Sequence, residues 1–307
     1  MSLASSVARD RAGGLGVLWR FARPHTIVGT AISVAGLYAI AVAELPGSGL
    51  DHLWWVLVAA ACVNVAIVGI NQLTDVEIDR VNKPWLPIAA GDLSREAAWR
   101  TVSVAAAVPV GLALTQGVLE TAAVVASLAV GAAYSLPPVR LKRYPVAAAL
   151  SISGVRAAAV NLGVYGHFSL AFGGGGAIAA PVWALTLFVL PFSFAIAVLK
   201  DVPDMEGDRR FRIATFTVRL GPRRAARLGI GALVVAYAGM IALGPLVLGG
   251  AQPVVLIAGH AAALAALLVW ARRADPNDRD AFSAFYMRVW ILFFLEYLLV
   301  PAAVLLG

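Results

Sequence analysis

Nine long apolar runs dominate this chain, and each is long enough to cross a lipid bilayer as a helix. The sequence is 61% hydrophobic and 13% charged, whereas about a quarter of the residues in a soluble domain are charged. Roughly 20 apolar residues in a helix span the hydrocarbon core of a bilayer. The predicted segments are Val17–Ala43, Leu53–Ile78, Ala98–Leu114, Val118–Tyr134, Val146–Gly166, Pro181–Leu199, Ala225–Leu248, Pro253–Ala271 and Phe282–Leu306.

These runs predict an all-α, polytopic membrane protein with about nine transmembrane helices around a central cavity, capped by cytoplasmic loops. No long polar segment remains for a soluble domain, so residues 1–307 are interpreted as a single membrane domain. Residues 1–15 are expected to be a flexible cytoplasmic N-terminus. The first apolar run is too long for a typical signal peptide, which favours a retained helix.

The basic residues alternate between the connections, and this alternation predicts the orientation in the membrane. Lys and Arg occur at the N-terminus and after runs two, four, six and eight, but not after runs one, three, five and seven. Because cytoplasmic loops carry the excess of Lys and Arg, the N-terminus and the even-numbered exits are expected in the cytoplasm. The net charge of +7 is explained by this topology, and nucleic-acid binding is not expected.

Two acidic clusters lie at the predicted cytoplasmic ends of runs two and six. Asn71, Asp75 and Asp79 are spaced i, i+4, i+8, so on a continuous helix they drift by only about 40° per step and share a face. Asp201, Asp204 and Asp208 are spaced i, i+3, i+7, although Pro203 and Gly207 are expected to loosen that turn. Carboxylates are costly near hydrocarbon, and such residues usually serve a function.

Oxygen ligands without nearby His or Cys favour a hard cation, and Mg²⁺ is the expected ion. Mg²⁺ commonly binds through a few carboxylates and substrate phosphates, which suits a diphosphate lying between the clusters. The cation would stabilise negative charge on a departing diphosphate. A prenyl diphosphate fits a membrane protein because its head would bind the metal while its tail lies among the helices. Five aromatic residues are candidates by type for stabilising an allylic cation: Tyr134, Tyr165, Trp183, Phe192 and Phe194.

Two other interpretations of the clusters are open. The carboxylates are either solvated helix ends, or ligands of an ion transporter. Transport sites usually lie near the bilayer midplane, whereas these clusters lie near its edge.

Four stretches of the chain resemble the UbiA superfamily of intramembrane prenyltransferases, in particular its homogentisate prenyltransferase branch. They are residues 20–30, residues 71–87 with the N-x-x-x-D-x-x-x-D pattern, residues 156–168, and residues 200–221 with the D-x-x-D-x-x-x-D pattern. The resemblance implies Mg²⁺-dependent prenyl transfer from a phytyl or geranylgeranyl diphosphate to an aromatic acceptor such as homogentisate, in prenylquinone or tocopherol-type biosynthesis. It also implies an integral membrane enzyme, expected in a bacterial inner membrane with cytoplasmic active-site loops.

The resemblance implies roles for particular residues. Metal and diphosphate binding falls to Asn71, Asp75, Asp79, Asp201, Asp204 and Asp208, with Asp75, Asp79, Asp204 and Asp208 counted as catalytic. A basic loop after run four makes Lys142 and Arg143 candidates for the diphosphate, and Lys83 and Lys200 lie beside the acidic clusters.

Candidates for the acceptor are Arg23, His25 and Arg156, because homogentisate carries a carboxylate. Arg156 is also counted as catalytic, since an arginine inside an apolar run is expensive unless it is paired or reaches an aqueous cavity. It would otherwise pair with a cluster carboxylate. His167 falls on the outer side of the predicted topology and is discounted.

The remaining alternatives concern the acceptor. The chain would be a membrane terpene cyclase of the same superfamily, without any acceptor, or it would prenylate another phenol similar to 4-hydroxybenzoate. The sequence does not distinguish these from homogentisate prenylation.

Overall fold

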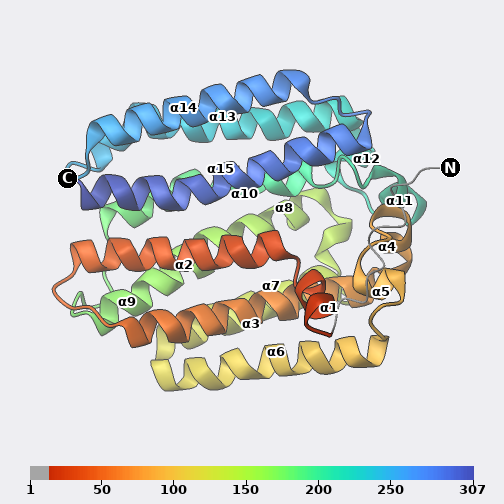
Figure 1. Cartoon of the computed structure of the whole chain (residues 1–307), viewed down its shortest axis with the longest axis horizontal. Helices are drawn as coiled ribbons and strands as arrows, with labels where there is room; N and C mark the ends of the chain where they lie inside the picture. Colours follow the sequence, from red (N-terminus) through yellow and green to blue (C-terminus); the bar gives the residue numbers. More distant parts are fainter. Residues whose placement is uncertain (1–13) are drawn as a thin grey trace.

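A computed structural model describes residues 14–307, and every regular element in that range is a helix. Nine helical segments of this range are long and apolar enough to cross a membrane, which confirms the predicted fold class. Figure 1 shows them lying side by side as one bundle. They are α2 (Pro24–Glu44), α3 (Leu50–Thr74), α6 (Arg95–Gln116), α7 (Val118–Ser135), the continuous segment Pro145–Ala171, α10 (Ala180–Leu199), α13 (Pro222–Val247), α14 (Pro253–Arg273) and α15 (Arg279–Leu305).

The start of the first predicted segment, at Val17, is wrong. A separate short helix, α1 (Gly14–Phe21), precedes α2, and the chain turns at Arg23, whose φ is 53°. Pro24 follows, and the residue before a proline is disfavoured in the α-helical region. This turn places Arg23 directly before the start of α2 rather than inside a helix.

The expected flexible segment 1–15 falls almost entirely on residues 1–13, which lie outside the described residues. Gly14 and Leu15 are the first residues of α1. The basic residues Arg9 and Arg11 of the predicted topology also lie outside the described residues.

The fifth segment changes its helix type along its length. It is α-helical in α8 (Pro145–Gly154), π-helical in η3 (Val155–Val164) and α-helical again in α9 (Tyr165–Ala171). It ends beyond the predicted Gly166. π-Helical turns are rare in proteins, and those that do occur are often located at functional sites. Arg156 lies in η3, so the unusual stretch carries one of the predicted acceptor residues.

The connection between Asn82 and α6 is partly irregular, because Pro84 and Pro87 disfavour a continuous helix. Residues 83–86 are not helical, and the short helix α5 (Pro87–Ala90) comes after them. Ser94 then caps α6, because its Oγ accepts a hydrogen bond from the backbone N–H of Ala97 at 3.1 Å. Such caps satisfy one of the free N–H groups at a helix start.

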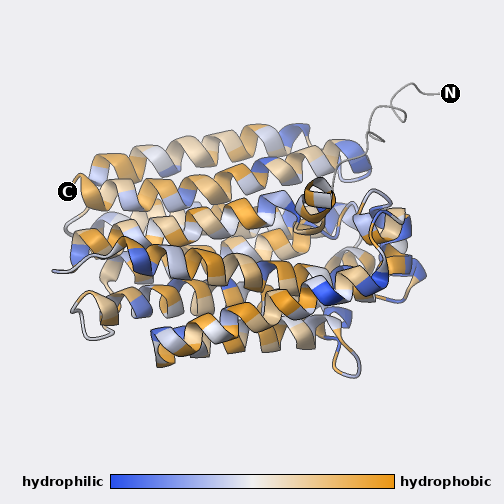
Figure 2. Cartoon of the chain, turned by 60° about the horizontal axis from the view of Figure 1, so that its bottom comes forward, coloured by the Kyte–Doolittle hydropathy of each residue, from blue (hydrophilic) through white to orange (hydrophobic). Residues whose placement is uncertain are grey.

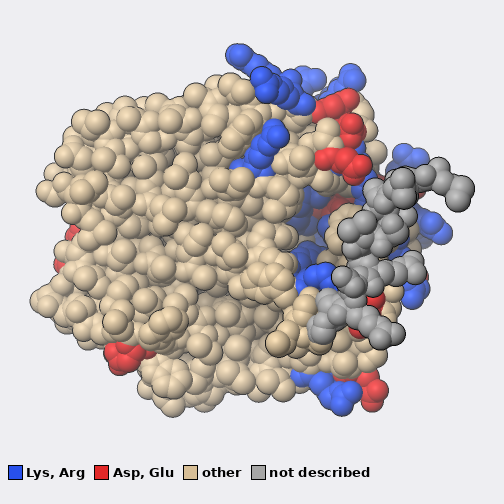
Figure 3. Space-filling model, in the orientation of Figure 1, with Lys and Arg blue, Asp and Glu red and all other residues tan. Residues whose placement is uncertain are grey.

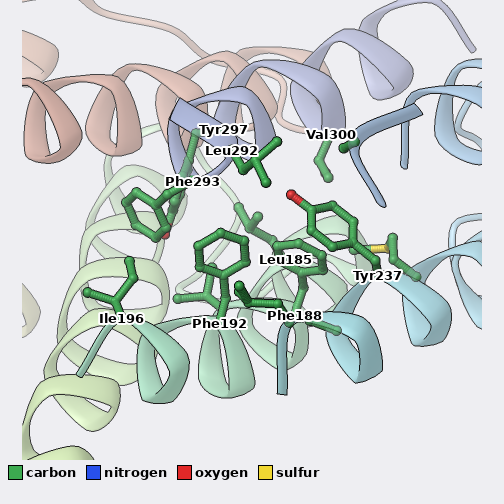
Figure 4. Packing of buried hydrophobic residues seen from close by; sticks show 14 of the residues in the cluster. Leu185, Phe188, Phe192, Ile196, Tyr237, Leu292, Phe293, Tyr297 and Val300 are labelled. Carbon is green, nitrogen blue, oxygen red and sulfur yellow. The ribbon is translucent and has the colours of Figure 1, made fainter. Parts of the chain in front are cut away.

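The centre of the bundle is α10, the most buried of these long segments. Of the residues in its most apolar stretch, 72% are buried inside the protein. Figure 4 shows its Leu185, Phe188 and Phe192 packed against Tyr237 of α13 and Phe293 of α15. The ring centroids of Phe192 and Phe293 are 5.7 Å apart. Aromatic pairs at such distances add to the stabilisation that burial gives.

Large apolar side chains also cover the outside of the bundle. Leu187, Val235, Leu246 and Val254 are 65–79% exposed, which suits contact with lipid. Figure 2 shows hydrophobic residues along the long helices and hydrophilic residues gathered at one end. Figure 3 shows that Lys and Arg lie at that same end, on the right of the view, whereas the opposite end is almost free of them. The protein is therefore an integral membrane protein with one strongly basic end.

Candidate active site

A cavity of about 340 Å³ lies between the helices and reaches the basic end of the bundle. Residues of α2, α3, α7, α10, α15 and the segment 145–171 form its wall. All six predicted metal-binding residues line it: Asn71, Asp75, Asp79, Asp201, Asp204 and Asp208. Two clusters that are far apart in sequence therefore share one cavity.

The first cluster is not on one continuous helix. α3 ends at Thr74, Asp75 has φ −115° and ψ 17°, and α4 (Val76–Asn82) begins after it. The predicted single helical face is wrong in this respect. The break turns α4, and all three side chains still reach the cavity because Asp75 lies at the corner. Within the cluster, Asn71 Nδ2 donates to Asp75 Oδ2 at 2.9 Å.

The second cluster begins where α10 ends, and Pro203 lies in the turn there, as predicted. The prediction for Gly207 is wrong, because Gly207 lies inside the short helix that follows. Residues 200–204 form turns, and α11 (Met205–Arg210) begins after Asp204. α11 packs against α4, and both lie at the basic end in Figure 1. From the last long helix, an Arg279 guanidinium donates to the backbone carbonyl of Asn82. These contacts hold the ends of α3, α10 and α15 together around the carboxylates.

Basic side chains already neutralise part of this negative charge. Lys142 Nζ donates to Asp75 Oδ1, Lys83 Nζ donates to Asp204 Oδ2, and Lys200 Nζ donates to Asp201 at 2.7 Å. The three lysines named from the sequence therefore line the cavity, each bound to a carboxylate.

The other member of the predicted basic pair does not reach the site. Arg143 is exposed and does not line the cavity. It ends the one-turn 3₁₀ helix η2 (Leu141–Arg143), which turns Lys142 inward and Arg143 outward. Arg140 does not line this cavity either, but it contacts the first cluster, because its Nη2 donates to Asp75 Oδ1 at 3.2 Å. Arg140 has φ 42°, and no local sequence signal distinguished it from its neighbours.

Two carboxyl groups of the site each have one oxygen without a hydrogen-bond partner. Oδ2 of Asp79 and Oδ2 of Asp208 are buried without a hydrogen-bond partner among residues 14–307. Burial raises the pKa of Asp79 to about 6, although the charges of Arg23 and Lys83 oppose the shift. Burial, followed by the charges of Asp201 and Asp204, raises the pKa of Asp208 to about 8. A site that disfavours its own carboxylate charges in this way suits a bound cation.

The oxygen-only character of these side chains fits a hard divalent ion such as Mg²⁺. No three His, Cys, Asp or Glu side chains of the described residues converge on one point as they stand. Instead, the ammonium groups of Lys83 and Lys142 lie on Asp204 and Asp75. A metal would therefore compete with these lysines for the same oxygens.

The predicted acceptor residues lie further along the same cavity. Arg23, His25 and Arg156 all line it. The guanidinium of Arg156 lies 4.7 Å from the ring centroid of Trp290 and 4.9 Å from that of Phe293. The His25 ring meets Trp290 edge-on, with centroids 5.0 Å apart. Within the described part of the chain Arg156 forms no ion pair, so it does not bind a cluster carboxylate.

The aromatic residues around this part of the cavity come mainly from α15. Tyr286, Trp290, Phe293 and Tyr297 line it, and their spacing of i, i+4, i+7, i+11 places them on one helix face. The same spacing is visible in the sequence, and it is the signal that would have identified these four aromatic residues. Of the five aromatic candidates named by type, only Tyr134 lines the cavity. Phe192 and Tyr165 are buried in the core, Trp183 is half exposed, and Phe194 packs against Phe216.

A UbiA prenyltransferase family model matches residues 30–292. The chain belongs to the UbiA prenyltransferase family. It is 42% identical to a homogentisate phytyltransferase of Synechocystis sp. over 296 residues, which cover 93% of this chain and 94% of the relative. It is 41% identical to a chloroplastic homogentisate solanesyltransferase of Arabidopsis thaliana over 299 residues, covering 92% and 75% of the two chains.

A solved UbiA homologue from Archaeoglobus fulgidus, bound to DMAPP and Mg²⁺, has the same fold. It superposes with a TM-score of 0.63 and covers 91% of this chain and 98% of its own, at 21% identity. Membership of the family confirms the predicted resemblance and makes the protein a prenyltransferase. The ion-transporter interpretation of the carboxylates is therefore set aside.

Proposed function

We propose that the protein transfers a prenyl group of the phytyl or geranylgeranyl type from its diphosphate to homogentisate, with Mg²⁺ as cofactor. The observation that carries this proposal is the arrangement of one cavity. Both acidic clusters lie at its basic end. In its interior Arg156, which has no ion-pair partner among residues 14–307, lies beside the rings of Trp290 and Phe293. The names of the relatives support the acceptor.

The diphosphate head would lie between the clusters. Asn71, Asp75, Asp79, Asp201, Asp204 and Asp208 would hold Mg²⁺. The ion would neutralise the diphosphate and make it a better leaving group. Lys83, Lys142, Lys200 and Arg140 lie on these carboxylates, and their charges would stabilise the leaving diphosphate. Arg143 is exposed and does not line the cavity. Its binding of the diphosphate therefore stays a prediction from the sequence.

The acceptor would bind around Arg156. Its guanidinium would meet the carboxylate of homogentisate, a pairing that gives strong, geometrically specific hydrogen bonds. The edge of Trp290 and the ring of His25 bound the same space, and Arg23 contributes a second cation at the turn before α2. The apolar and aromatic walls would exclude water from the allylic cation.

Prenyl transfer breaks one bond of the prenyl diphosphate and forms one carbon–carbon bond to the acceptor. The allylic carbon–oxygen bond breaks, and diphosphate leaves with the electron pair. An electron-rich ring carbon of the acceptor forms the new carbon–carbon bond and loses its proton. With homogentisate the acetate carboxyl leaves as CO₂, and a proton takes its place on the remaining methylene carbon. Tyr134 is positioned near the head, since its hydroxyl lies 3.3 Å from Lys200 Nζ.

The site would face the cytoplasm. Lys and Arg gather at the end that holds the carboxylates, and cytoplasmic loops carry such residues. In a bacterium this corresponds to the inner membrane.

An assay matrix tests the proposal. Purified protein in detergent is given Mg²⁺ and geranyl, geranylgeranyl, phytyl or solanesyl diphosphate, each with homogentisate, 4-hydroxybenzoate or no acceptor. The products are identified by mass spectrometry. We expect prenylated, decarboxylated homogentisate with geranylgeranyl or phytyl diphosphate. A cyclic hydrocarbon formed without an acceptor would identify a terpene cyclase. A product formed only with 4-hydroxybenzoate would show that this phenol, and not homogentisate, is the acceptor.

A further inference from the structure

A buried hydrogen bond joins the π-helical segment η3 to α15 beside the part of the cavity that holds Arg156. The Tyr297 hydroxyl donates to Asn161 Oδ1, and the two oxygens lie 2.6 Å apart. Asn161 is 0% exposed and Tyr297 is 1% exposed. Tyr297 lines the cavity, and its ring lies next to that of Phe293 in Figure 4, with centroids 5.2 Å apart. Asn161 does not line the cavity, so it acts on a bound molecule through other side chains.

The π-helical form of η3 brings Arg156 and Asn161 to the same side of the helix. They are five residues apart, and the hydrogen bonds of a π-helix join residues at this spacing. On an α-helix, five residues would turn through about 500°, which leaves two side chains roughly 140° apart. In η3 the Arg156 guanidinium reaches the rings of Trp290 and Phe293. The Asn161 amide, one turn further along, reaches Tyr297 on the same helix α15.

α15 is itself packed closely against α2. A Cβ atom on Gly36 would lie 2.5 Å from the backbone oxygen of Tyr297, and one on Gly29 would lie 3.1 Å from a ring carbon of Trp290. Small residues at a helix crossing let two backbones approach this closely. α2 therefore fixes the face of α15 that carries Trp290 and Tyr297, and Asn161 ties η3 to that face.

We propose that Asn161 is a positioning residue, which by its hydrogen bond to Tyr297 holds the Arg156 guanidinium where the acceptor carboxylate binds. This inference rests on the proposed function, since it assumes that Arg156 binds that carboxylate. The attraction between a guanidinium and a ring face acts over several ångströms, so it fixes the guanidinium less closely than a hydrogen bond would. A misplacement of about 1 Å in a substrate-positioning group can cost about 10²-fold in rate. The anchor of the helix that carries Arg156 therefore matters for acceptor binding.

A purely structural role for the same bond is the alternative. Loss of one partner leaves the other buried and unpaired, which lowers stability, whereas exchange of both partners for apolar groups of the same shape can be nearly neutral. Asn161→Leu combined with Tyr297→Phe makes such an exchange. It also removes Asn161 Nδ2, which has no hydrogen-bond partner within residues 14–307. The double variant therefore separates stability from positioning.

The experiment measures both KM values and the thermal unfolding temperature of Asn161→Leu, Tyr297→Phe and the double variant. We expect the KM for homogentisate to rise roughly fivefold or more in all three, with the KM for geranylgeranyl diphosphate within about twofold of wild type. The double variant should unfold closer to the wild-type temperature than either single variant. Ser33 of α2 also lies beside the Tyr297 hydroxyl, and Asn161→Leu leaves that contact in place.

Tyr237→Phe is the matched control. Tyr237 is a buried tyrosine of α13, its hydroxyl has no hydrogen-bond partner within residues 14–307, and it does not line the cavity. Both KM values of this variant should equal those of wild type. A KM for homogentisate that returns to the wild-type value in the double variant would assign a purely structural role to the bond and overturn the inference.

A cycle with Arg156→Ala tests whether Asn161 acts through Arg156. Residues that act through one another are not additive. In the Arg156→Ala background, Asn161→Leu should therefore change the KM for homogentisate by less than about twofold. A full additive rise there, an equal rise of both KM values in Asn161→Leu, or a wild-type KM in that variant overturns the inference.

The same measurements separate this inference from the proposed function. If wild type transfers no prenyl group to homogentisate, or if Arg156→Ala leaves the KM for homogentisate unchanged, the proposed acceptor site fails and this inference fails with it. If Arg156→Ala raises that KM and Asn161→Leu does not, only this inference fails.

Discussion

The side chain of Asn82 accepts a hydrogen bond from the backbone N–H of Gly207, with Oδ1 and N 2.9 Å apart. Asn82 ends α4 after the first acidic cluster, and Gly207 lies in α11 within the second. This bond joins the two clusters directly. It also explains the glycine, because a Cβ at position 207 would lie 2.5–2.6 Å from the Asn82 amide atoms.

Gly207→Ala should therefore separate the clusters. The added methyl group forces the Asn82 side chain or α11 to move, and overpacking of this kind typically costs about 1–3 kcal/mol. We expect a lower thermal unfolding temperature and a loss of prenyl transfer. Gly239→Ala in α13 is the control, because, apart from its own turn of helix, no atom of residues 14–307 lies within 4 Å of a Cβ there. Wild-type activity in Gly207→Ala would show that the contact does not position the site.

Asp75→Asn and Asp204→Asn should each lower kcat by about 10²–10³-fold, the scale of losing one preorganised electrostatic contact. Each variant removes the charge while keeping the side-chain size. Glu77→Gln is the matched control, since Glu77 lies between Asp75 and Asp79 in the sequence but is exposed and pairs with Arg80 at 2.7 Å. The readout is steady-state turnover on protein that elutes as a single folded species.

Arg156→Ala should raise the KM for homogentisate by roughly 10- to 100-fold, because a hydrogen bond to a charged group contributes about 1.5–3 kcal/mol. The KM for the prenyl diphosphate should change little. Arg288→Ala serves as the control, since Arg288 is the other arginine within a long apolar run, but it is exposed and lies 5.8 Å from the Trp270 ring centroid. Equal losses for both substrates would place Arg156 at the diphosphate instead.

Removal of divalent ions should abolish turnover, and Mg²⁺ should restore it. Ca²⁺ should restore less, because it accepts longer and more numerous oxygen contacts. Activity is measured after chelation and dialysis, and then across a Mg²⁺ titration. Full turnover in the chelated enzyme would contradict a metal-dependent site.

Much of the architecture was predictable because it depends on local sequence. The long helices follow from apolar length, and a serine directly before a helix start, such as Ser94, favours an N-cap. The helix breaks were harder to place. Arg23 and Asp75 leave the helical conformation at corners that also depend on how α1 and α4 pack. The continuous helices that periodicity predicted are therefore interrupted at these two residues.

The site was predictable where residue type and spacing carry the chemistry, as for the six metal-binding candidates. Arg140 was missed because three basic residues stand together in that loop, and only its backbone geometry directs it to Asp75. Glu120, which lines the cavity from the first turn of α7, was missed because a glutamate at that position resembles an ordinary residue of a helix end.

The central claim is that the two clusters form one binding site, and a double-mutant cycle tests it most directly. Calorimetry measures Mg²⁺-dependent binding of a non-hydrolysable geranylgeranyl thiodiphosphate to wild type, Asp75→Ala, Asp204→Ala and the double variant. Residues that act together are not additive. We predict that each single variant loses most of the affinity and that the double variant loses little more. Additive losses, or wild-type affinity in either single variant, would contradict a shared site.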